Sequence, residues 1–366
     1  MSAAPSPSQR YAAGVARGDW QQDPAQLAVL PALDRMHHAL LAPEPSPGLL
    51  DRLRRRPPPP APDGLYLWGG VGRGKTFLID LFHEGLPAHL GKRRTHFHRF
   101  MREVHERLRA HEGERDPMVA IARDLRAGLR VLVLDEFMVS DIGDAMLLAR
   151  LLERLFAEGV LLVTTSNVAP GDLYKGGLQR ARFLPAIEQI ERHCQVHELA
   201  SDTDYRLRAL TRSPVYRAPL DAGSDAWLHQ RWRELGGDDG HLDAGIDIDG
   251  RRIPVRARSK GLCWFDFQAL CEGPRGTADF IEVAREFHTV LLGGIPRMDA
   301  SRDDAARRFV HLIDELYDRH VNLVCTADGP PTGLYSGERL AGAFERTASR
   351  LTEMQSADYL ASEHLA

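Results

Sequence analysis

The sequence predicts an α/β protein with a parallel sheet core, and three apolar segments indicate it. Residues 65–68, 131–134 and 160–163 are apolar throughout, as expected for short strands buried on both faces of a parallel sheet. Helical patterns separate them, which is the alternation that parallel crossovers need. Because parallel strands end at one edge of a sheet, we expect the polar residues that follow these segments to form one site.

A glycine-rich run follows the first strand and fits the pattern G-x-x-x-x-G-K-[ST], and the residues after it are typical of a helix start. Its glycines let the backbone curl so that successive N–H groups face one anion, and the helix N-terminus adds partial positive charge. Lys75 suits the β- and γ-phosphates, and the Thr76 hydroxyl suits Mg²⁺. The run therefore predicts a nucleoside triphosphate site formed by Gly69, Gly70, Val71, Gly72, Arg73, Gly74, Lys75 and Thr76.

Two carboxylates, Asp135 and Glu136, end the second strand. Asp135 suits the Mg²⁺ shell, directly or through water, and Glu136 suits a general base that polarises the attacking water. An acidic helix cap is the alternative explanation, but the upstream phosphate loop favours catalysis. The adjacent Glu also disfavours a small-molecule kinase, since many kinases of this fold carry only the Asp.

Polar residues further along extend the predicted site. Asn167 follows the third strand, where its amide would hold the attacking water or the γ-phosphate; the alternative is a turn that it starts with Pro170. Next comes a run with Arg180 and Arg182, and an Arg at that distance fits an arginine finger presented to a neighbouring subunit. Because the chain is rich in arginine, a solvated surface role is an equal alternative.

These motifs occur in the order seen in AAA-type ATPases, and further segments extend the match over nearly the whole chain. The segments are GGVGRGKTFLIDLF (69–82), HFHRFM (96–101), LDEFMVSDIGDAMLL (134–148), TTSN (164–167), LYKGGLQRARFLPAI (173–187), DYRLR (204–208), FHTVLL (287–292), RRFVHLIDELYD (307–318) and SRLTEMQS (349–356). On them the chain resembles the ZapE family of bacterial cell-division ATPases, relatives of the mitochondrial AFG-type ATPases. The resemblance implies a P-loop NTPase (AAA-like) core, ATP and Mg²⁺ as cofactors, Arg180 rather than Arg182 as the finger, and association with the division-ring protein FtsZ.

A helix and a linker are expected before the core. Residues 23–40 show a helical apolar face behind an Asp23 cap, whereas the first nine residues are expected to be irregular. Gln26 either reaches the adenine edge or is a surface residue, and we favour the surface. The basic, proline-rich run 54–60 predicts a stiff spacer. The expected division is an N-terminal helical segment and linker (1–60), the ATPase core (61–210), an insertion with a β-hairpin turning at Asp249-Gly250 (211–260) and a C-terminal α/β unit (261–366).

The C-terminal unit repeats a pattern of the core. Laying residues 151–176 over 312–337 without a gap gives ten identities. With looser spacing, residues 289–294 echo 131–136, with Gly293-Gly294 in place of the two carboxylates. We interpret this unit as a degenerate copy that has lost its nucleotide chemistry; convergent helix–strand patterning is the alternative. A copy predicts parallel strands at Leu291-Leu292 and 321–326, and one ATP per chain.

Composition agrees with a cytoplasmic enzyme. The 366 residues carry a net charge of −4, which indicates no bias towards nucleic acid or membranes. Four scattered cysteines predict reduced thiols, and no apolar run reaches the ~18 residues of a membrane span.

The best-fitting function is Mg²⁺-dependent ATP hydrolysis by a homo-oligomer with shared active sites, coupled to remodelling of a protein partner. A nucleic-acid-associated ATPase such as a helicase loader is the alternative from another class. A nucleotide-dependent binding module with negligible turnover is the third.

Overall fold

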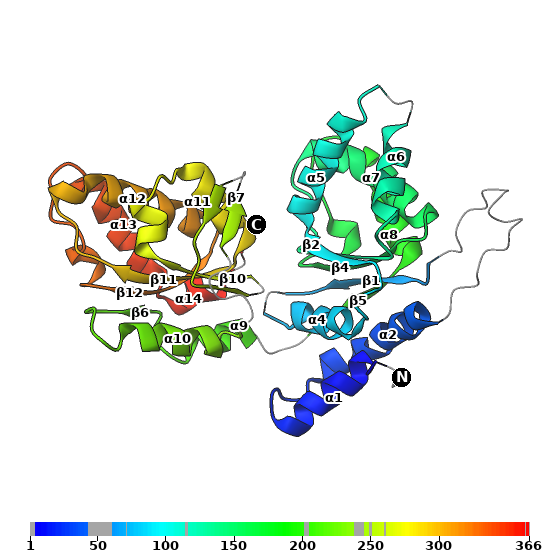
Figure 1. The fold of residues 1–366 in the computed structure, drawn as a ribbon, viewed down its shortest axis with the longest axis horizontal. Coiled ribbons are helices and arrows are strands. Elements are labelled where there is room, and N and C mark those ends of the chain that lie inside the picture. Colours follow the sequence, from blue (N-terminus) through cyan, green and yellow to red (C-terminus); the bar gives the residue numbers. More distant parts are fainter. Residues whose placement is uncertain are drawn as a thin grey trace, which may run out of the picture. The chain divides into compact units, whose positions relative to one another are not determined.

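The computed structural model describes residues 4–42, 61–70, 72–113, 116–200, 205–237, 245–248, 251–259, 261–362 and 364–365. The chain divides into two compact units, Met1–Asp204 and Tyr205–Ala366 (Figure 1). This division lies slightly before the expected end of the core at residue 210. Val71, the spacer 54–60 and the turn Asp249-Gly250 lie outside the described residues.

Within the described residues 4–42 and 61–63, two helices precede the first strand. Helix α1 (Pro7–Arg17) starts with a reciprocal cap, in which the Ser6 hydroxyl accepts from the N–H of Gln9 and the Gln9 side chain accepts from the N–H of Ser6. The expectation of irregular structure over the first nine residues is wrong from Pro7 onward, because this capping box starts a helix there. Helix α2 (Pro24–Leu41) begins at its predicted cap, where the Asp23 carboxylate accepts from the N–H of Ala25 at 2.8 Å.

The first unit contains a five-stranded parallel sheet in the order β2-β3-β4-β1-β5. The three strands predicted from the sequence are present, and the strand that leads into the phosphate loop lies inside the sheet, between β4 and β5. All five strands end at one edge, as parallel pairing requires. The strands are β1 (Gly64–Trp68), β2 (Lys92–His96), β3 (Val131–Asp135), β4 (Leu161–Ser166) and β5 (Cys194–Glu198).

Alternate residues of these strands face two separate cores, one on each face of the sheet. Leu65 and Leu67 pack with apolar residues of α1, α2 and α4, whereas Tyr66 and Leu132 pack with those of the helices on the opposite face (Figure 1). Burial on both faces explains the uninterrupted apolar runs of the sequence. The remaining helices of this unit are α4 (Lys75–Gly85), α5 (Phe97–Ala110), α6 (Pro117–Arg126), α7 (Ile142–Ala157) and α8 (Leu184–His193).

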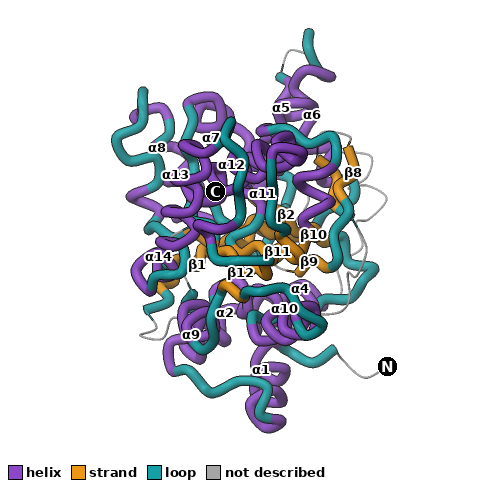
Figure 2. Tube along the Cα trace, turned by 90° about the vertical axis from the view of Figure 1, so that its left-hand side faces the viewer, coloured by secondary structure: helices purple, strands orange, loops and turns teal. Residues whose placement is uncertain are grey.

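The second unit contains its own sheet, with helices on both of its faces (Figure 2). Strands β6 (Tyr216–Arg217), β12 (Asn322–Ala327), β11 (Thr289–Ile295) and β10 (Leu262–Asp266) are parallel in that order, and β9 (Ala257–Ser259) runs antiparallel at the edge. The helices are α9 (Tyr205–Thr211), α10 (Ser224–Glu234), α11 (Thr277–Glu286), α12 (Asp303–Asp318), α13 (Ala341–Glu353) and α14 (Ala357–Ala361).

The stretch 211–260, expected as an insertion, contributes both regular elements and a hairpin. Strand β6 and helix α10 belong to the second sheet and its packing. The predicted hairpin strands are present as β7 (Ile246–Ile248) and β8 (Arg251–Ile253), with Ile248 paired to Arg251. The difference arises because α10 has only a weak apolar periodicity in the sequence, although Leu228 and Trp232 are buried.

The sequence echo corresponds to matching elements in the two units. Helix α7 corresponds to α12 and strand β4 to β12, with both bounds of each pair agreeing under the alignment of 151–176 with 312–337. Strands β11 and β12 pair in parallel, as β3 and β4 do. The predicted parallel pairing of these segments is confirmed.

Candidate active site

The phosphate loop joins β1 to α4 and has a backbone that requires glycine. Gly69, Gly72 and Gly74 have φ values of 150°, 73° and 91°, in the region that side chains disfavour. A Cβ on Gly69 would also lie 2.7 Å from the carbonyl oxygen of Leu199. Helix α4 begins at Lys75, directly after the loop, so its first N–H groups are available to an anion.

The Lys75 ammonium brings the loop and the end of β4 together. Its Nζ donates to the carbonyl oxygens of Gly69 (2.6 Å) and Gly70 (2.8 Å) and to Oδ1 of Asn167 (2.9 Å). Lys75 is buried, so these bonds satisfy a charge that has little access to water. Two residues that the sequence assigned to the site, from segments far apart in the chain, are thus in direct contact.

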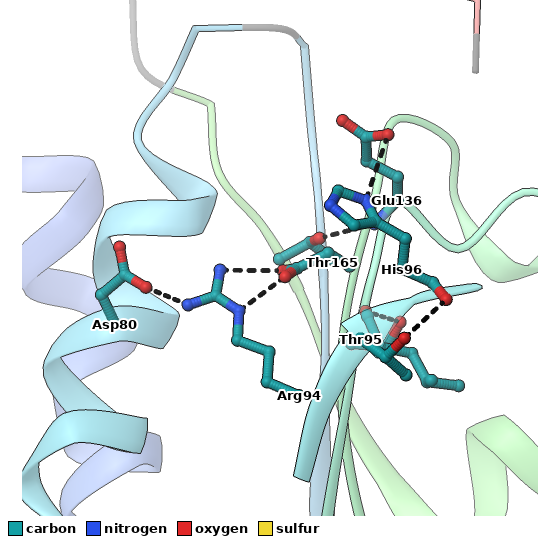
Figure 3. Close-up of polar contacts among 9 residues, drawn as sticks. Asp80, Arg94, Thr95, His96, Glu136 and Thr165 are labelled. Atoms are coloured by element: carbon teal, nitrogen blue, oxygen red, sulfur yellow. Dashed lines mark hydrogen bonds and ion pairs between the residues drawn. The ribbon is translucent and has the colours of Figure 1, made fainter. Parts of the chain in front are cut away.

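Asp135 lies at the end of β3 and is held by an arginine that sequence analysis missed. Arg94 of β2 donates from Nε to Oδ2 of Asp135 (2.6 Å) and from Nη2 to Oδ1 (3.1 Å). Its Nη1 donates to Asp80 of α4, and Figure 3 shows these two side chains facing each other. Burial acts to lower the pKa of Arg94, but the charges of Asp135 and Asp80 outweigh it and raise that pKa.

Glu136 follows β3 with a left-handed backbone, φ 53°. Its N–H donates to the Thr165 hydroxyl of β4 at 3.1 Å, which fixes this conformation. Its Oε2 lies 3.7 Å from Nδ1 of His96, and the two side chains face each other in Figure 3. His96 ends β2 directly beside Asp135 in register. The signal for His96 was its place at the end of a strand, but β2 is polar and lacks the apolar run that marks β1, β3 and β4.

The residues assigned to Mg²⁺ fit that ion. The Asp135 carboxylate lies at the strand end and Thr76 is exposed in the first turn of α4, so both supply hard oxygen donors. Mg²⁺ usually keeps several waters and takes few protein ligands. The described residues contain no group of three or more His, Cys, Asp or Glu that could hold a metal ion.

Arg180 and Arg182 lie in a short 3-10 turn (Arg180–Arg182) before α8. Arg180 donates from Nη2 to the carbonyl oxygen of Gly171 at 2.5 Å, and Arg182 is exposed. The described contacts of Arg180 do not include the phosphate loop of its own chain. Leu178 and Leu184, which flank the turn, are exposed large apolar residues.

Gln26 is not a surface residue, which corrects the favoured interpretation. It is only 4% exposed, in the first turn of α2. A Cβ on Gly74 would lie 2.5 Å from its Nε2, so the amide abuts the phosphate loop. The apolar periodicity predicted the buried face of α2 but did not indicate that this helix docks beside the loop.

Two further features of the described part of the chain are the environment of its cysteines and the apolar length of its helices. All four cysteines are free and buried, as expected for reduced thiols. In the residues that the structure describes, there is no helix whose length and apolar character would let it cross a membrane.

Comparisons with known proteins match the chain over almost its full length. Residues 5–363 match the model of AFG1-like ATPases. The cell division protein ZapE of Escherichia coli (strain K12) is 42% identical over 371 residues, covering 99% of this chain and 99% of that protein. An uncharacterized protein of Schizosaccharomyces pombe is 33% identical over 90% of this chain and 80% of its own length. Among solved structures, DnaI is 18% identical with a TM-score of 0.35, covering 49% of this chain and 87% of that one.

Proposed function

The chain belongs to the AFG1-like ATPase family and is an ATPase, and we propose that it hydrolyses Mg²⁺·ATP at the carboxyl edge of the first sheet. The observation that carries this proposal is the contact of Lys75 with Asn167 beside the Asp135–Glu136 strand end. It joins the loop that would bind the phosphates to the residues that would act on the attacking water.

The residues have complementary roles in this proposal. Lys75 exchanges the carbonyls of Gly69 and Gly70 for phosphate oxygens, and the first N–H groups of α4 bind the same anion. Glu136 accepts a proton from the attacking water, and the Asn167 amide orients that water. Thr76 and Asp135 would hold Mg²⁺, which neutralises charge developing on the phosphates when bound.

The hydroxyls of β4 hold this catalytic edge in shape. Thr164 donates to the carbonyl oxygen of Leu134 (2.8 Å), and Ser166 donates to that of Phe137 (2.8 Å). Together with the bond from Glu136 to Thr165, they tie the strand end that carries the proposed base to its neighbour. Such preorganisation reduces the rearrangement needed during reaction.

We assign Arg180 to the active site of a neighbouring subunit in a homo-oligomer. Its position outside its own phosphate loop and the exposed apolar residues beside it support a trans arrangement. Mixing Arg180→Ala with Lys75→Ala subunits tests it, because a mixed interface joins an intact loop to an intact finger. We expect partial rescue and activity per subunit that rises with concentration. No rescue together with concentration-independent turnover contradicts the trans assignment.

The proposed partner is FtsZ, and the proposed role is remodelling or regulation of the division ring in the cytoplasm. The support is the relative named as a cell division protein at 42% identity, together with the family resemblance. The test is phosphate release with and without polymerised FtsZ, combined with co-sedimentation. A changed rate and co-sedimentation are expected; neither would be seen if the partner assignment is wrong, and the basal ATPase rate would be unaffected by that failure.

Gln26 is proposed to recognise the adenine of ATP. Its amide offers one donor and one acceptor, the set that adenine presents in reverse at its N6 and N7 edge. Its burial against Gly74 places it at the loop rather than in solvent.

A further inference from the structure

Arg94 and Asp80 form a charge cluster with Asp135, and the proposed mechanism gives neither Arg94 nor Asp80 a role. One guanidinium is shared between Asp135 and Asp80, and the three side chains are 16%, 10% and 10% exposed. Three buried charges in contact interact strongly, because little water screens them. The cluster carries a net charge of −1.

The cluster lies where a cation bound by Asp135 would feel it. Both oxygens of Asp135 accept from Arg94, one from Nε and one from Nη2, in the fork geometry that makes such pairs strong. Asp80 is one helical turn beyond Thr76 on the same side of α4. The proposed magnesium ligands, Thr76 and Asp135, therefore come from the two elements that Arg94 connects.

We propose that Arg94 is an internal counter-ion that competes with Mg²⁺ for Asp135, and that Asp80 weakens this competition by drawing on the same guanidinium. Arg94 and Asp80 are thus positioning residues that set the magnesium affinity of the site. The proposal rests on the proposed function, in which Asp135 serves Mg²⁺.

The physical basis is that Arg94 and Asp80 carry opposite charges and therefore act in opposite directions on Mg²⁺ at Asp135. A fixed positive charge beside Asp135 repels an arriving Mg²⁺ and occupies lone pairs that the ion or its waters would use. Without Asp80, the whole of the Arg94 charge acts on Asp135, so Mg²⁺ binding becomes weaker. Without Arg94, two carboxylates remain near the site, so Mg²⁺ binding becomes tighter. The two changes act in opposite directions.

The test measures the affinity of a fluorescent ATP analogue in EDTA and at increasing MgCl₂. We expect Asp80→Asn to raise the half-saturating MgCl₂ concentration and Arg94→Gln to lower it, each by roughly tenfold, the scale of one unit charge acting at short range in a partly buried site. Affinity in EDTA should change less. Arg93→Gln is the matched control, since Arg93 lies on the same strand but pairs with Glu103; it should leave the magnesium response unshifted.

General damage to the site would weaken the magnesium response of both variants, and that result, like the absence of any shift, overturns the proposal. If Arg94→Gln does not fold because it removes the positive charge between the two carboxylates, Asp80→Asn decides alone, since the Arg94–Asp135 pair stays intact. Asp135→Asn separates the two levels of inference. If Asp135→Asn responds to MgCl₂ as the wild type does, the assignment of Asp135 to Mg²⁺ fails, and this proposal fails with it. If Asp135→Asn alters the response but Asp80→Asn and Arg94→Gln do not, only this proposal fails.

Discussion

Corresponding strands of the two units carry different residues at matching positions of the same backbone frame. Strand β3 ends at Asp135 and is followed by Glu136, whereas β11 has Gly293 and Gly294 at the matching register positions. The N–H of Glu136 donates to the Thr165 hydroxyl, and the N–H of Gly294 donates to the hydroxyl of Thr326, both at 3.1 Å. The second unit keeps this backbone arrangement and its hydrogen bond but lacks the two carboxylates. The backbone arrangement alone therefore does not supply the proposed catalytic groups.

The loops before α4 of the first unit and α10 of the second unit differ in the same sense. Where the first unit has its phosphate loop, the second joins β6 to α10 through residues 218–223. There the Asp221 carboxylate accepts from the N–H of Gly223 at 2.8 Å and from the Ser224 hydroxyl at 3.3 Å. Hydrogen bonds from Arg217 and from Gly223 lower the pKa of Asp221. A carboxylate of the chain thus lies beside the start of α10, where it would repel a phosphate.

A third correspondence supports descent of the second unit from the first. The Tyr66 hydroxyl donates to the carbonyl oxygen of Val168 (2.9 Å), and the Tyr216 hydroxyl donates to that of Gly329 (2.7 Å). Each tyrosine lies on the strand beside β4 or its counterpart β12. Convergent packing of helices on strands does not require side chain to backbone bonds at matching positions, so we favour duplication.

The largest expected effect is at the carboxylate that only the first unit has. Glu136→Gln should leave ATP binding nearly intact and lower turnover at least ~100-fold, the usual scale for losing a general base. Phosphate release and equilibrium nucleotide binding measure the two effects. Turnover at the wild-type rate would show that Glu136 is not the base.

A binding titration tests whether the second unit has really lost its nucleotide chemistry. The wild type should bind one ATP per chain. Lys75→Ala should lower the affinity of that site roughly tenfold or more, because the phosphates lose their ammonium partner, and it should reveal no second site. Two nucleotides bound per wild-type chain would show that the second unit binds nucleotide. One nucleotide bound with unchanged affinity in Lys75→Ala would show the same.

The matched threonines give a paired experiment. Thr165→Val removes the acceptor that fixes Glu136 and should lower turnover by about tenfold, a loss of roughly 1.4 kcal/mol in positioning. Thr326→Val removes the same bond from Gly294 and should leave turnover unchanged while lowering the thermal unfolding midpoint slightly. Equal losses of turnover in both variants would mean that the bond supports folding rather than the base.

The smallest expected effect is at Gln26. Gln26→Ala should weaken ATP binding by a few-fold and GTP binding less, since one amide pair with adenine is lost. Competition binding with both nucleotides measures the change in preference. If the ATP-to-GTP preference does not change, Gln26 does not recognise adenine and only packs against the loop.

The sequence predicted the elements that have a local signal. Uninterrupted apolar runs located β1, β3 and β4, and an Asp cap located the start of α2. The glycine pattern located the phosphate loop before any contact was known. In these segments periodicity or composition follows directly from burial on one or two faces.

The missed residues depend on neighbours distant in the chain. Arg94 looks like one of many solvated arginines until β2 is placed in register beside β3, which brings it to Asp135. Gln26 becomes part of the site only when α2 docks beside the loop. No local pattern encodes such pairings, because the register of strands and the docking of helices are tertiary properties.

The backbone of Glu136 has a consequence for how such a protein changes over generations. A non-glycine residue at φ 53° is held in a conformation that costs about 1 kcal/mol or more. Gly294, at φ 75° in the other unit, adopts the same region without that penalty. Wherever selection for hydrolysis is relaxed, mutation of this Glu to Gly is therefore a downhill step that stabilises the fold as it abolishes the proposed base. Under this reasoning a glycine at this position is expected to persist once the catalytic Glu is lost, because mutating it back to Glu would destabilise the fold.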